Sequence, residues 1–280
     1  MLERFQFPPG NQCRLADWDT RAVDGAWDKD SAKAQTEANA AAMADLAYRL
    51  YAENRRALLL VLQGMDTSGK DGTIRKVLAD MDAQGVHVWS FKVPTEEERA
   101  HDFLWRHHID APALSMVAVF NRSYYEAVLV ELVRGIASPE VVRSRYPHIN
   151  DFEQLLAQSN TIVVKFYLAI SRETQEERLL ARQAELDNAW KLSVGDWEER
   201  KLWDDYMAAY QAALTATATP WAPWYVVPAD RKWYRNLAVA EALAETLRPF
   251  RAGWITALQE RGEVELAALR AAGYAPPEGS

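Results

Sequence analysis

The chain has little cysteine and no long apolar run, and each absence excludes a class of protein. Cys13 is the only cysteine among 280 residues, which excludes an intramolecular disulfide and a multi-cysteine metal site. The five histidines do not show the spacing of a zinc site. No apolar run approaches the length that spans a bilayer, and the first residues, MLERFQFPPG, lack the core of a signal peptide. We therefore expect a cytoplasmic protein that does not enter a membrane.

Positive charge is also in short supply, since 32 Lys and Arg stand against 40 Asp and Glu and the net charge is −8. General nucleic-acid binders carry basic patches, so this balance argues against a nucleic-acid partner. It does not exclude a polyanionic ligand, because a locally basic groove in an acidic protein can still attract anions. The hydrophobic content of 49% is typical of a globular protein. We expect one domain over residues 1–280.

The most informative stretch is ALLLVLQGMDTSGKDGTI, residues 57–74. Leu58 to Leu62 form the continuous apolar run of a strand that is covered on both faces. Gly64 and Gly69-Lys70 then match the phosphate-binding loop G-x-x-x-x-G-K-[ST], except that Asp71 stands at the last place. A helix with a buried face is predicted to follow, because apolar residues recur at helical spacing at Ile74, Val77, Leu78 and Met81. Glycines let the loop turn its N–H groups toward an anion at the positive end of that helix.

Two acidic residues distinguish this loop from the common pattern. Asp71 has no hydroxyl for a metal ion, and Asp66 lies inside the loop. A carboxylate there would repel phosphate unless a divalent cation lay between them, and Mg²⁺ is commonly held by one or two carboxylates together with substrate phosphates. We therefore predict that Asp66 holds Mg²⁺, directly or through water, with Mn²⁺ as the second candidate. A chance glycine-lysine turn is the alternative, which the flanking strand and helix disfavour.

Strand-like and helical patterns alternate along the rest of the chain. Strands are predicted at residues 57–63, 86–91, 116–120, 161–169 and 224–227, and helices between them near 72–83, 95–108, 123–135, 150–158 and 171–186. This alternation predicts an α/β fold, with a five-stranded parallel sheet between two layers of helices. Further helices are expected at 33–53, 196–215 and 233–270, and residues 1–30 as an extension over the surface.

The region 184–203 interrupts this alternation. It contains Trp190, Lys191 and a lone Gly195 among polar residues. A lid that closes over phosphates would have this composition, because closing lids complete a site and exclude water. An ordinary helix–loop–helix would have it too.

A second polar constellation, Asn121 to Glu126, follows the strand predicted at 116–120. Because ligands gather at the carboxyl ends of parallel strands, we expect it beside the glycine-rich loop. Arg122 could clamp a phosphate with two parallel hydrogen bonds, and Glu126 could reach the metal or the acceptor. Asn121 and Ser123 could instead cap the next helix, and the two roles are compatible.

Together these stretches resemble the second family of polyphosphate kinases, enzymes that move phosphate between inorganic polyphosphate and nucleotides. The resemblance rests on GMDTSGKDGTIRKV from Gly64, VPTEEERAHDFLWR from Val93, VFNRSYYEAVLV from Val119, WEERKLWDDYMAAY from Trp197 and WYVVPADRKWYRNLAVA from Trp224. The matches run in family order over roughly residues 35–250. The FNRS…VLV form resembles subgroups that accept AMP, or both AMP and ADP.

The resemblance implies a P-loop kinase-like fold with a helical lid and assigns roles to residues. The catalytic set would be Asp66, Lys70, Arg122 and the lid arginines Arg178 and Arg182. Phosphate and nucleotide would be bound by Gly64, Met65, Thr67, Ser68, Gly69, Asp71, Gly72, Asn121 and Glu126. A polyphosphate channel would be lined by Lys92, Arg106, Arg75 and Lys232. The implied partners are polyphosphate, adenine nucleotides (guanine nucleotides as a second candidate) and further copies of the chain in a dimer or tetramer.

Three positions depart from the family pattern. Tyr124 and Ala189 stand where histidine is usual, and Ala127 replaces an aspartate near the predicted metal. The loss of that carboxylate predicts slower transfer or a different choice of acceptor. Two other functions remain open: an ATP-dependent nucleoside monophosphate kinase with the same fold, loop and lid, and a non-catalytic regulator that binds polyphosphate or nucleotide.

Overall fold

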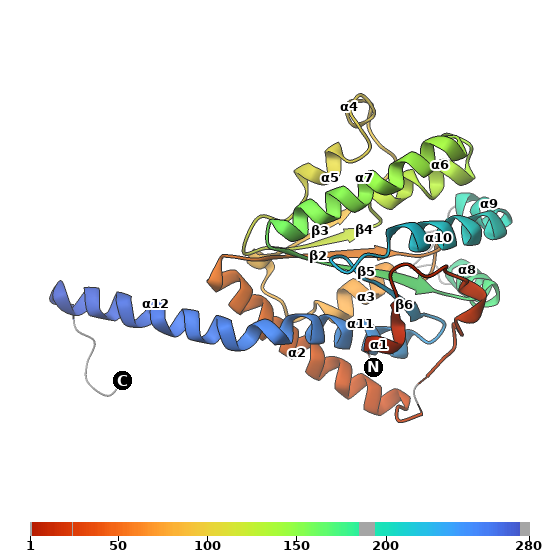
Figure 1. The fold of residues 1–280 in the computed structure, drawn as a ribbon. Helices are drawn as coiled ribbons and strands as arrows, with labels where there is room; N and C mark the ends of the chain where they lie inside the picture. Colours follow the sequence, from red (N-terminus) through yellow and green to blue (C-terminus); the bar gives the residue numbers. More distant parts are fainter. Residues whose placement is uncertain (1, 24, 185–193, 275–280) are drawn as a thin grey trace.

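The computed structural model describes residues 2–23, 25–184 and 194–274. Within them one sheet has six strands in the order β1-β6-β5-β2-β4-β3 (Figure 1). Five strands are parallel to one another, as the sequence predicts: β2 (Ala57–Gln63), β3 (Val86–Ser90), β4 (Val117–Asn121), β5 (Thr161–Ala169) and β6 (Trp224–Pro228). Strand β2 lies between β4 and β5, and all seven of its residues are buried, which explains its continuous apolar run.

The predicted strand count of five is wrong by one, because the extension also contributes to the sheet. Strand β1 (Gln6–Phe7) pairs antiparallel with β6, and Phe7 lies opposite Trp224. Phe5, Phe7 and Cys13 are buried in the core. The mixture of Pro, Gly and charged residues in 1–30 predicts a surface extension, and a strand of two residues has no alternating pattern that could correct this prediction.

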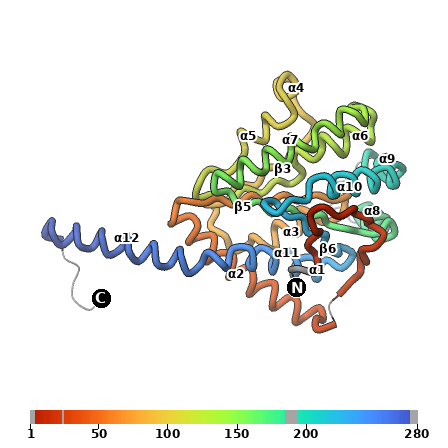
Figure 2. Tube along the Cα trace, in the orientation of Figure 1, coloured from red at the N-terminus to blue at the C-terminus, as the bar shows by residue number. Residues whose placement is uncertain are grey.

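Helices cover both faces of the sheet (Figures 1 and 2). In this view one layer contains α5 (Trp105–Ile109), α7 (Pro139–Gln158) and α10 (Trp203–Thr217), and the other contains α2 (Lys29–Glu53), α3 (Lys70–Val77) and α11 (Lys232–Leu247). The two layers are each held by direct contacts, α7 with α10 and α11 with α2 and α3. The remaining segments are α1 (Leu2–Phe5), η1 (Leu15–Asp17), η2 (Ala83–Gly85), α4 (Glu96–Arg99), η3 (Tyr124–Ala127), α6 (Val130–Val133), α8 (Arg172–Ala184), α9 (Val194–Lys201), η5 (Arg248–Phe250) and α12 (Arg251–Ala271).

Helix α7 is much longer than the predicted 150–158. It begins at Pro139, after Ser138 caps its end by accepting a hydrogen bond from the N–H of Val141, and it contains Pro147. Proline is favourable in the first turn of a helix but unfavourable inside one. Pro147 therefore argued against a helix over residues 139–149, and only the second half of α7 was predicted. The predicted helices 95–108 and 123–135 are instead each divided into two short segments, α4 with α5 and η3 with α6.

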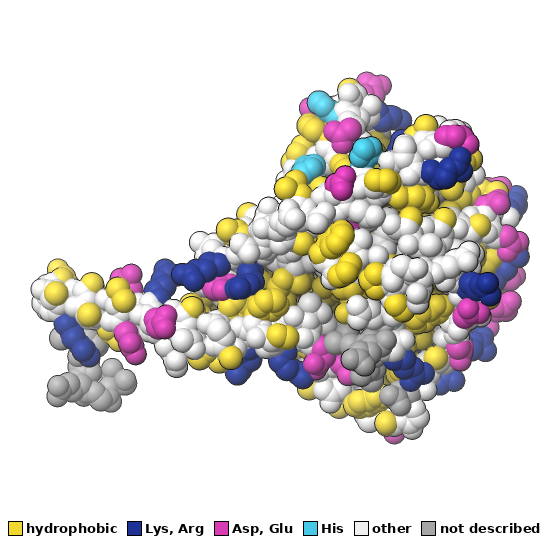
Figure 3. All heavy atoms as spheres, viewed as in Figure 1, with side chains coloured by type: hydrophobic (Ala, Val, Ile, Leu, Met, Phe, Trp, Pro, Cys, Tyr) yellow, Lys and Arg dark blue, Asp and Glu magenta, His cyan; other side chains and the backbone are white. Residues whose placement is uncertain are grey.

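Helix α12 extends away from the body of the molecule (Figures 1 and 3). Trp254 near its start is buried, whereas every residue from 259 to 274 is exposed. Among the described helices, none is both long enough and apolar enough to cross a membrane.

Candidate active site

The glycine-rich loop connects the buried end of β2 to the start of α3 at Lys70. Two of its glycines are required by the backbone. Gly64 has φ +149° and Gly69 has φ +102°, conformations that residues with a side chain rarely adopt. A Cβ atom at Gly64 would lie 2.8 Å from Oγ of Ser68, and one at Gly69 would lie 1.7 Å from Nη1 of Arg235. The loop therefore closes tightly on itself and on helix α11.

The side chain of Lys70 is folded back over this loop and is 8% exposed. Its Nζ donates hydrogen bonds to the carbonyl oxygens of Gly64 (2.7 Å) and Met65 (3.3 Å). Burial lowers the pKa of Lys70 to about 8, Arg122 lowers it as well, and the carboxylate of Asp66 acts in the opposite direction. An ammonium group in this environment would be stabilised by an incoming anion.

The loop and the second constellation meet at the ends of β2 and β4. Arg122, which has φ +63°, donates from Nη2 to Oδ1 of Asp66 at 2.6 Å and from Nη1 to Oε2 of Glu126 at 3.3 Å. Nδ2 of Asn121 donates to Oδ1 of Asp71 at 2.6 Å. The expected juxtaposition therefore occurs, and both acidic residues of the loop have a partner in the second constellation. The pKa of Glu126 is raised by burial, against the opposing effect of Arg122.

Ser123 caps the segment after this turn, since its Oγ accepts a hydrogen bond from the N–H of Tyr125 at 3.3 Å. Asn121 does not cap η3 and is instead directed at Asp71. The sequence allowed both residues as caps, and in the structure only Ser123 has this role.

The two arginines expected from the lid have different partners. Nη1 of Arg178 donates to the carbonyl oxygen of Thr67 at 2.8 Å, and its Nη2 donates to those of Ala229 (2.6 Å) and Asp230 (2.8 Å). Arg178 thus contacts the loop from helix α8. Arg182, one turn later, pairs with Asp196 of α9 at 3.5 Å.

Much of the predicted lid, including Ala189, Trp190 and Lys191, falls on residues 185–193, which lie outside the described residues. Its described part is α9, which is tied to neighbouring helices. Glu199 of α9 pairs with Arg134 after α6, and Arg200 pairs with Glu176 of α8 at 2.5 Å.

A cavity of about 730 Å³ opens beside the loop. It is lined by the loop residues 64–66 and by Arg122, Lys92 and Arg106. Two of the four predicted channel residues therefore face the same space as the loop. Nη1 of Arg106 donates to the carbonyl oxygen of Lys92 at 2.9 Å. Arg75 and Lys232 are not among the residues that line this cavity, and both are exposed, on α3 and at the start of α11.

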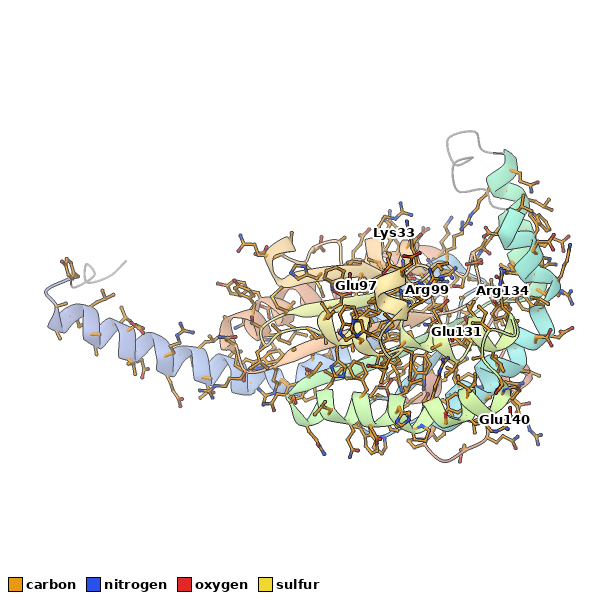
Figure 4. The ribbon with its side chains drawn as sticks, turned by 90° about the horizontal axis from the view of Figure 1, so that it is seen from above. Lys33, Glu97, Arg99, Glu131, Arg134 and Glu140 are labelled. Carbon is orange, nitrogen blue, oxygen red and sulfur yellow. The ribbon has the colours of Figure 1, made fainter. Side chains whose placement is uncertain are left out.

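The far part of the cavity contains basic and acidic side chains in pairs. Arg106 pairs with Glu98 at 3.4 Å, and Arg145 pairs with Glu131 at 2.7 Å. Arg99 on α4 and Glu131 and Arg134 of the α6 region belong to the same lining and are labelled in Figure 4. An anionic ligand that binds here would therefore replace a carboxylate, Glu98 or Glu131, as the partner of its arginine.

A buried polar network anchors the segment that carries Glu126. Nζ of Lys165 on β5 and Oε2 of Glu153 on α7 are 2.6 Å apart and fully buried. The hydroxyl groups of Tyr124 and Tyr125 donate to Oε1 of Glu153 at 2.8 and 2.9 Å. Tyr124, which replaces the family's usual histidine, therefore points into this network. Ala127 lines the cavity and is buried.

Sequence reasoning missed two residues of this site, Arg235 and Asp196. Arg235 on α11 is 3% exposed and donates from Nη1 to the carbonyl oxygen of Ser68 at 3.1 Å. Its signal was an arginine in the apolar pattern around Tyr234 and Leu237. Asp196 lines the cavity; burial and the charge of Asp66 raise its pKa, whereas Arg182 lowers it. No motif marks Asp196, which reaches the site only through the packing of α9.

The carboxylates of the site are too few for a metal cage but suit a substrate-bound cation. Among the described residues, no group of three or more His, Cys, Asp and Glu is arranged to hold a metal ion. Mg²⁺ commonly needs only one or two carboxylates together with phosphates. The mutual repulsion between Asp66 and Asp196 is the environment in which a cation would be favourable. Asp66 therefore fits the predicted role.

The fold and this loop define the class: a three-layer α/β protein with a phosphate-loop sequence at the end of a central parallel strand. The chain belongs to the polyphosphate kinase 2 family, since residues 26–251 match the family model described as Polyphosphate kinase 2 (PPK2).

Similar proteins agree with this assignment. The chain is 48% identical over 198 residues to an AMP/ADP-polyphosphate phosphotransferase of Meiothermus ruber, covering 71% of this chain and 74% of that protein. It is 40% identical over 257 residues to an ADP-polyphosphate phosphotransferase of Rhodopseudomonas palustris, covering 88% and 89%. The crystal structure of polyphosphate kinase 2 from Arthrobacter aurescens TC1 superposes with a TM-score of 0.86 at 43% identity and covers 89% of each chain.

Proposed function

We propose that this protein is a polyphosphate:nucleotide phosphotransferase, which transfers phosphate from inorganic polyphosphate to AMP, ADP or both and also catalyses the reverse reaction. The observation that carries the proposal is a single cavity that joins Arg122, Lys92 and Arg106 to the glycine-rich loop at Gly64 and Met65, whose carbonyl oxygens hold Nζ of Lys70. Lys92 and Arg106, the latter paired with Glu98 at 3.4 Å, place further cations in this cavity beyond the loop, where a chain of phosphates would extend. The names of the relatives, one for AMP and ADP and one for ADP, support these acceptors.

In the proposed reaction an oxygen of the nucleotide's terminal phosphate attacks the last phosphorus of polyphosphate. A new P–O bond forms, the phosphoanhydride bond behind that phosphorus breaks, and polyphosphate leaves one unit shorter. Such transfer depends on positioning and charge neutralisation more than on covalent chemistry. Lys70 and the loop N–H groups would hold the transferred phosphate, and Arg122, Arg178 and Arg182 would neutralise its charge.

The proposal includes Mg²⁺, with Mn²⁺ as the second candidate, held by Asp66. When bound, the ion would screen the phosphate charges and polarise the P–O bonds. Asp66 now pairs with Arg122 at 2.6 Å, so a cation at Asp66 would release the guanidinium of Arg122 for substrate.

The deciding experiment supplies AMP or ADP separately with polyphosphate and Mg²⁺ in the absence of ATP, and measures the nucleotide products by chromatography. We expect ADP or ATP to form. Formation of product only when ATP is the donor would favour the nucleoside monophosphate kinase. Tight binding of polyphosphate without turnover would favour the non-catalytic regulator.

In the same assay Asp66→Asn should raise the Mg²⁺ concentration required for half-maximal rate. Asp80→Asn, which alters an exposed carboxylate after α3, should not raise it.

We further propose that the protein assembles into a homodimer or homotetramer, is located in the cytoplasm, and accepts guanine nucleotides as well. Light scattering of the purified protein would measure its mass against the 31.8 kDa of one chain. GMP and GDP in the assay above would test the base preference.

A further inference from the structure

Arg235 is a buried cation whose partners are neutral. It is 3% exposed on α11, and within the described residues no carboxylate forms an ion pair with it. Its Nε and Nη2 donate to Oδ1 of Asn236 at 3.1 and 2.8 Å, and its Nη1 donates to the carbonyl oxygen of Ser68 at 3.1 Å. Burial of a charge without an opposite charge is costly, so a residue of this kind requires a reason.

A second guanidinium lies close to Arg235. Nη1 of Arg178 donates to the same carbonyl oxygen of Ser68 at 3.4 Å. Burial lowers the pKa of Arg235 to about 10, and the charge of Arg178 contributes in the same direction. Two guanidinium groups therefore lie behind one peptide of the loop. Asp230 and Glu177 act on the charge of Arg178, whereas phosphate in the loop would supply the opposite charge that Arg235 does not obtain from a carboxylate.

The contact of Arg235 also determines the direction of a loop N–H. In a trans peptide the carbonyl and the following N–H point to opposite sides. When the carbonyl of Ser68 is held toward α11, the N–H of Gly69 points away from α11. Contact between Nη1 of Arg235 and Gly69 leaves no room for a Cβ and keeps the loop at φ +102°. A preorganised N–H of this kind stabilises charge without reorganisation during the reaction.

We propose that Arg235 is a positioning residue of the phosphate loop: it orients the Ser68–Gly69 peptide toward the transferred phosphate and supplies positive charge behind that peptide without a carboxylate partner of its own. This inference rests on the proposed phosphotransferase function. It assigns no contact between Arg235 and substrate.

The test compares Arg235→Met, which keeps most of the side-chain volume without charge, and Arg235→Lys, which keeps the charge without the planar fork. Arg248→Met, at the other end of α11 where the arginine is exposed and paired with Glu245, is the matched control. Each protein is assayed for kcat and KM toward polyphosphate. Its melting temperature is also measured with and without inorganic tripolyphosphate.

We expect Arg235→Met to lower kcat/KM for polyphosphate about 100-fold, the order of loss that follows misplacement of a reacting group. Without tripolyphosphate, this variant should melt at the same temperature as wild type. With tripolyphosphate, it should lose most of the increase in melting temperature that wild type shows. Arg235→Lys should lie between Arg235→Met and wild type, and Arg248→Met should match wild type.

Two results would overturn the proposal. One is an Arg235→Met protein with the wild-type tripolyphosphate shift and kcat/KM. The other is an Arg235→Met protein that fails to fold while Arg235→Lys has full activity, which would make the role purely structural. If wild type itself fails to transfer phosphate, the function is wrong, but the tripolyphosphate shift still tests Arg235.

Discussion

At the scale of single residues, Lys70 shows how burial prepares a group for its ligand. The folded loop lowers its pKa from 10.5 to about 8. Between these two pH values the unfolded chain binds more protons than the folded chain, so the unfavourable contribution of this lysine to stability is fully present below pH 8 and diminishes above it. A bound phosphate restores the pKa toward its ordinary value. Binding therefore takes up a proton above pH 8.

This linkage predicts a pH dependence of substrate binding. Affinity for polyphosphate should fall above about pH 8, approaching a tenfold loss per pH unit while the complex stays protonated. Lys70→Ala should remove this dependence and lower kcat by about 100- to 1000-fold, the usual effect of losing one electrostatic donor. Steady-state kinetics from pH 6 to 10 would measure both, with Lys76→Ala, an exposed lysine on the same helix, as the control. A folded Lys70→Ala protein with full activity would contradict the assignment.

Two glycines should respond in opposite ways to the same substitution. Gly69→Ala forces a side chain into φ +102° and against Arg235, so we expect a loss of about 1–2 kcal/mol from the backbone alone and loss of tripolyphosphate binding. Gly262→Ala lies on exposed α12 with nothing within 4 Å of the new Cβ, and should stabilise that helix by about 0.5–1 kcal/mol. Urea unfolding and binding assays would measure both. Equal effects would show that the loop tolerates a side chain.

At the scale of elements, the ion pair between Lys165 and Glu153 connects β5 and α7 to the segment after Arg122. Both members are fully buried, and Nζ of Lys165 also donates to the carbonyl oxygen of Thr217 of α10 at 2.8 Å. A buried pair of this kind contributes little net stability but loses much when only one partner is removed. Its physical effect is to select one position for Tyr124 and Tyr125, and with them η3.

A double-mutant cycle would test this view of the pair. Glu153→Leu alone should destabilise the protein by about 3–5 kcal/mol, because Lys165 stays buried without an opposite charge. Adding Lys165→Met should recover a large part of that loss, although the hydroxyl groups of the two tyrosines remain without their acceptor. Urea denaturation gives each free energy of unfolding. Additive losses in the double variant would show that the two charges are not coupled.

At the scale of the whole molecule, α12 packs on α2 and η5 near its start and extends away from the body beyond them (Figure 1). Trp254 buries its side chain in the core, while residues 259–274 are exposed. An isolated helix of this length is marginal in water, so packing elsewhere or a second copy must favour it in solution.

Two truncations separate these contributions. Ending the chain after Leu258 should leave the melting temperature and activity of each protomer near wild type, because residues 259–274, the part of the removed segment that the structure describes, are exposed. Ending it after Phe250 removes Trp254 as well, and should destabilise the protein by about 3–5 kcal/mol, as loss of a buried tryptophan does. Thermal unfolding and light scattering would measure stability and mass. A large loss of stability in the protein that ends after Leu258 would show that the exposed half of α12 is covered in the assembly.

Much of this protein could be predicted from local signals alone. The apolar run of β2 and the spacing of Gly64, Gly69 and Lys70 depend on neighbouring residues, so strand, loop and helix were predictable without knowledge of the fold. The carboxyl ends of parallel strands lie at one edge, so the meeting of Arg122 with Asp66 was predictable as well. Residues far apart in the chain entered this prediction only through that general rule.

Tertiary structure alone decided the features that depend on the packing of distant elements. Strand β1 forms because β6 provides a sheet edge with which it can pair. Arg235 contacts the loop because α11 packs beside it, although Arg235 and Ser68 are 167 residues apart in the sequence. The same packing takes Arg75 and Lys232 out of the cavity lining and brings Asp196 into it. The physical reason is that the sequence determines local conformation and chemistry through short-range interactions, whereas the environment of a charge depends on which elements surround it after folding.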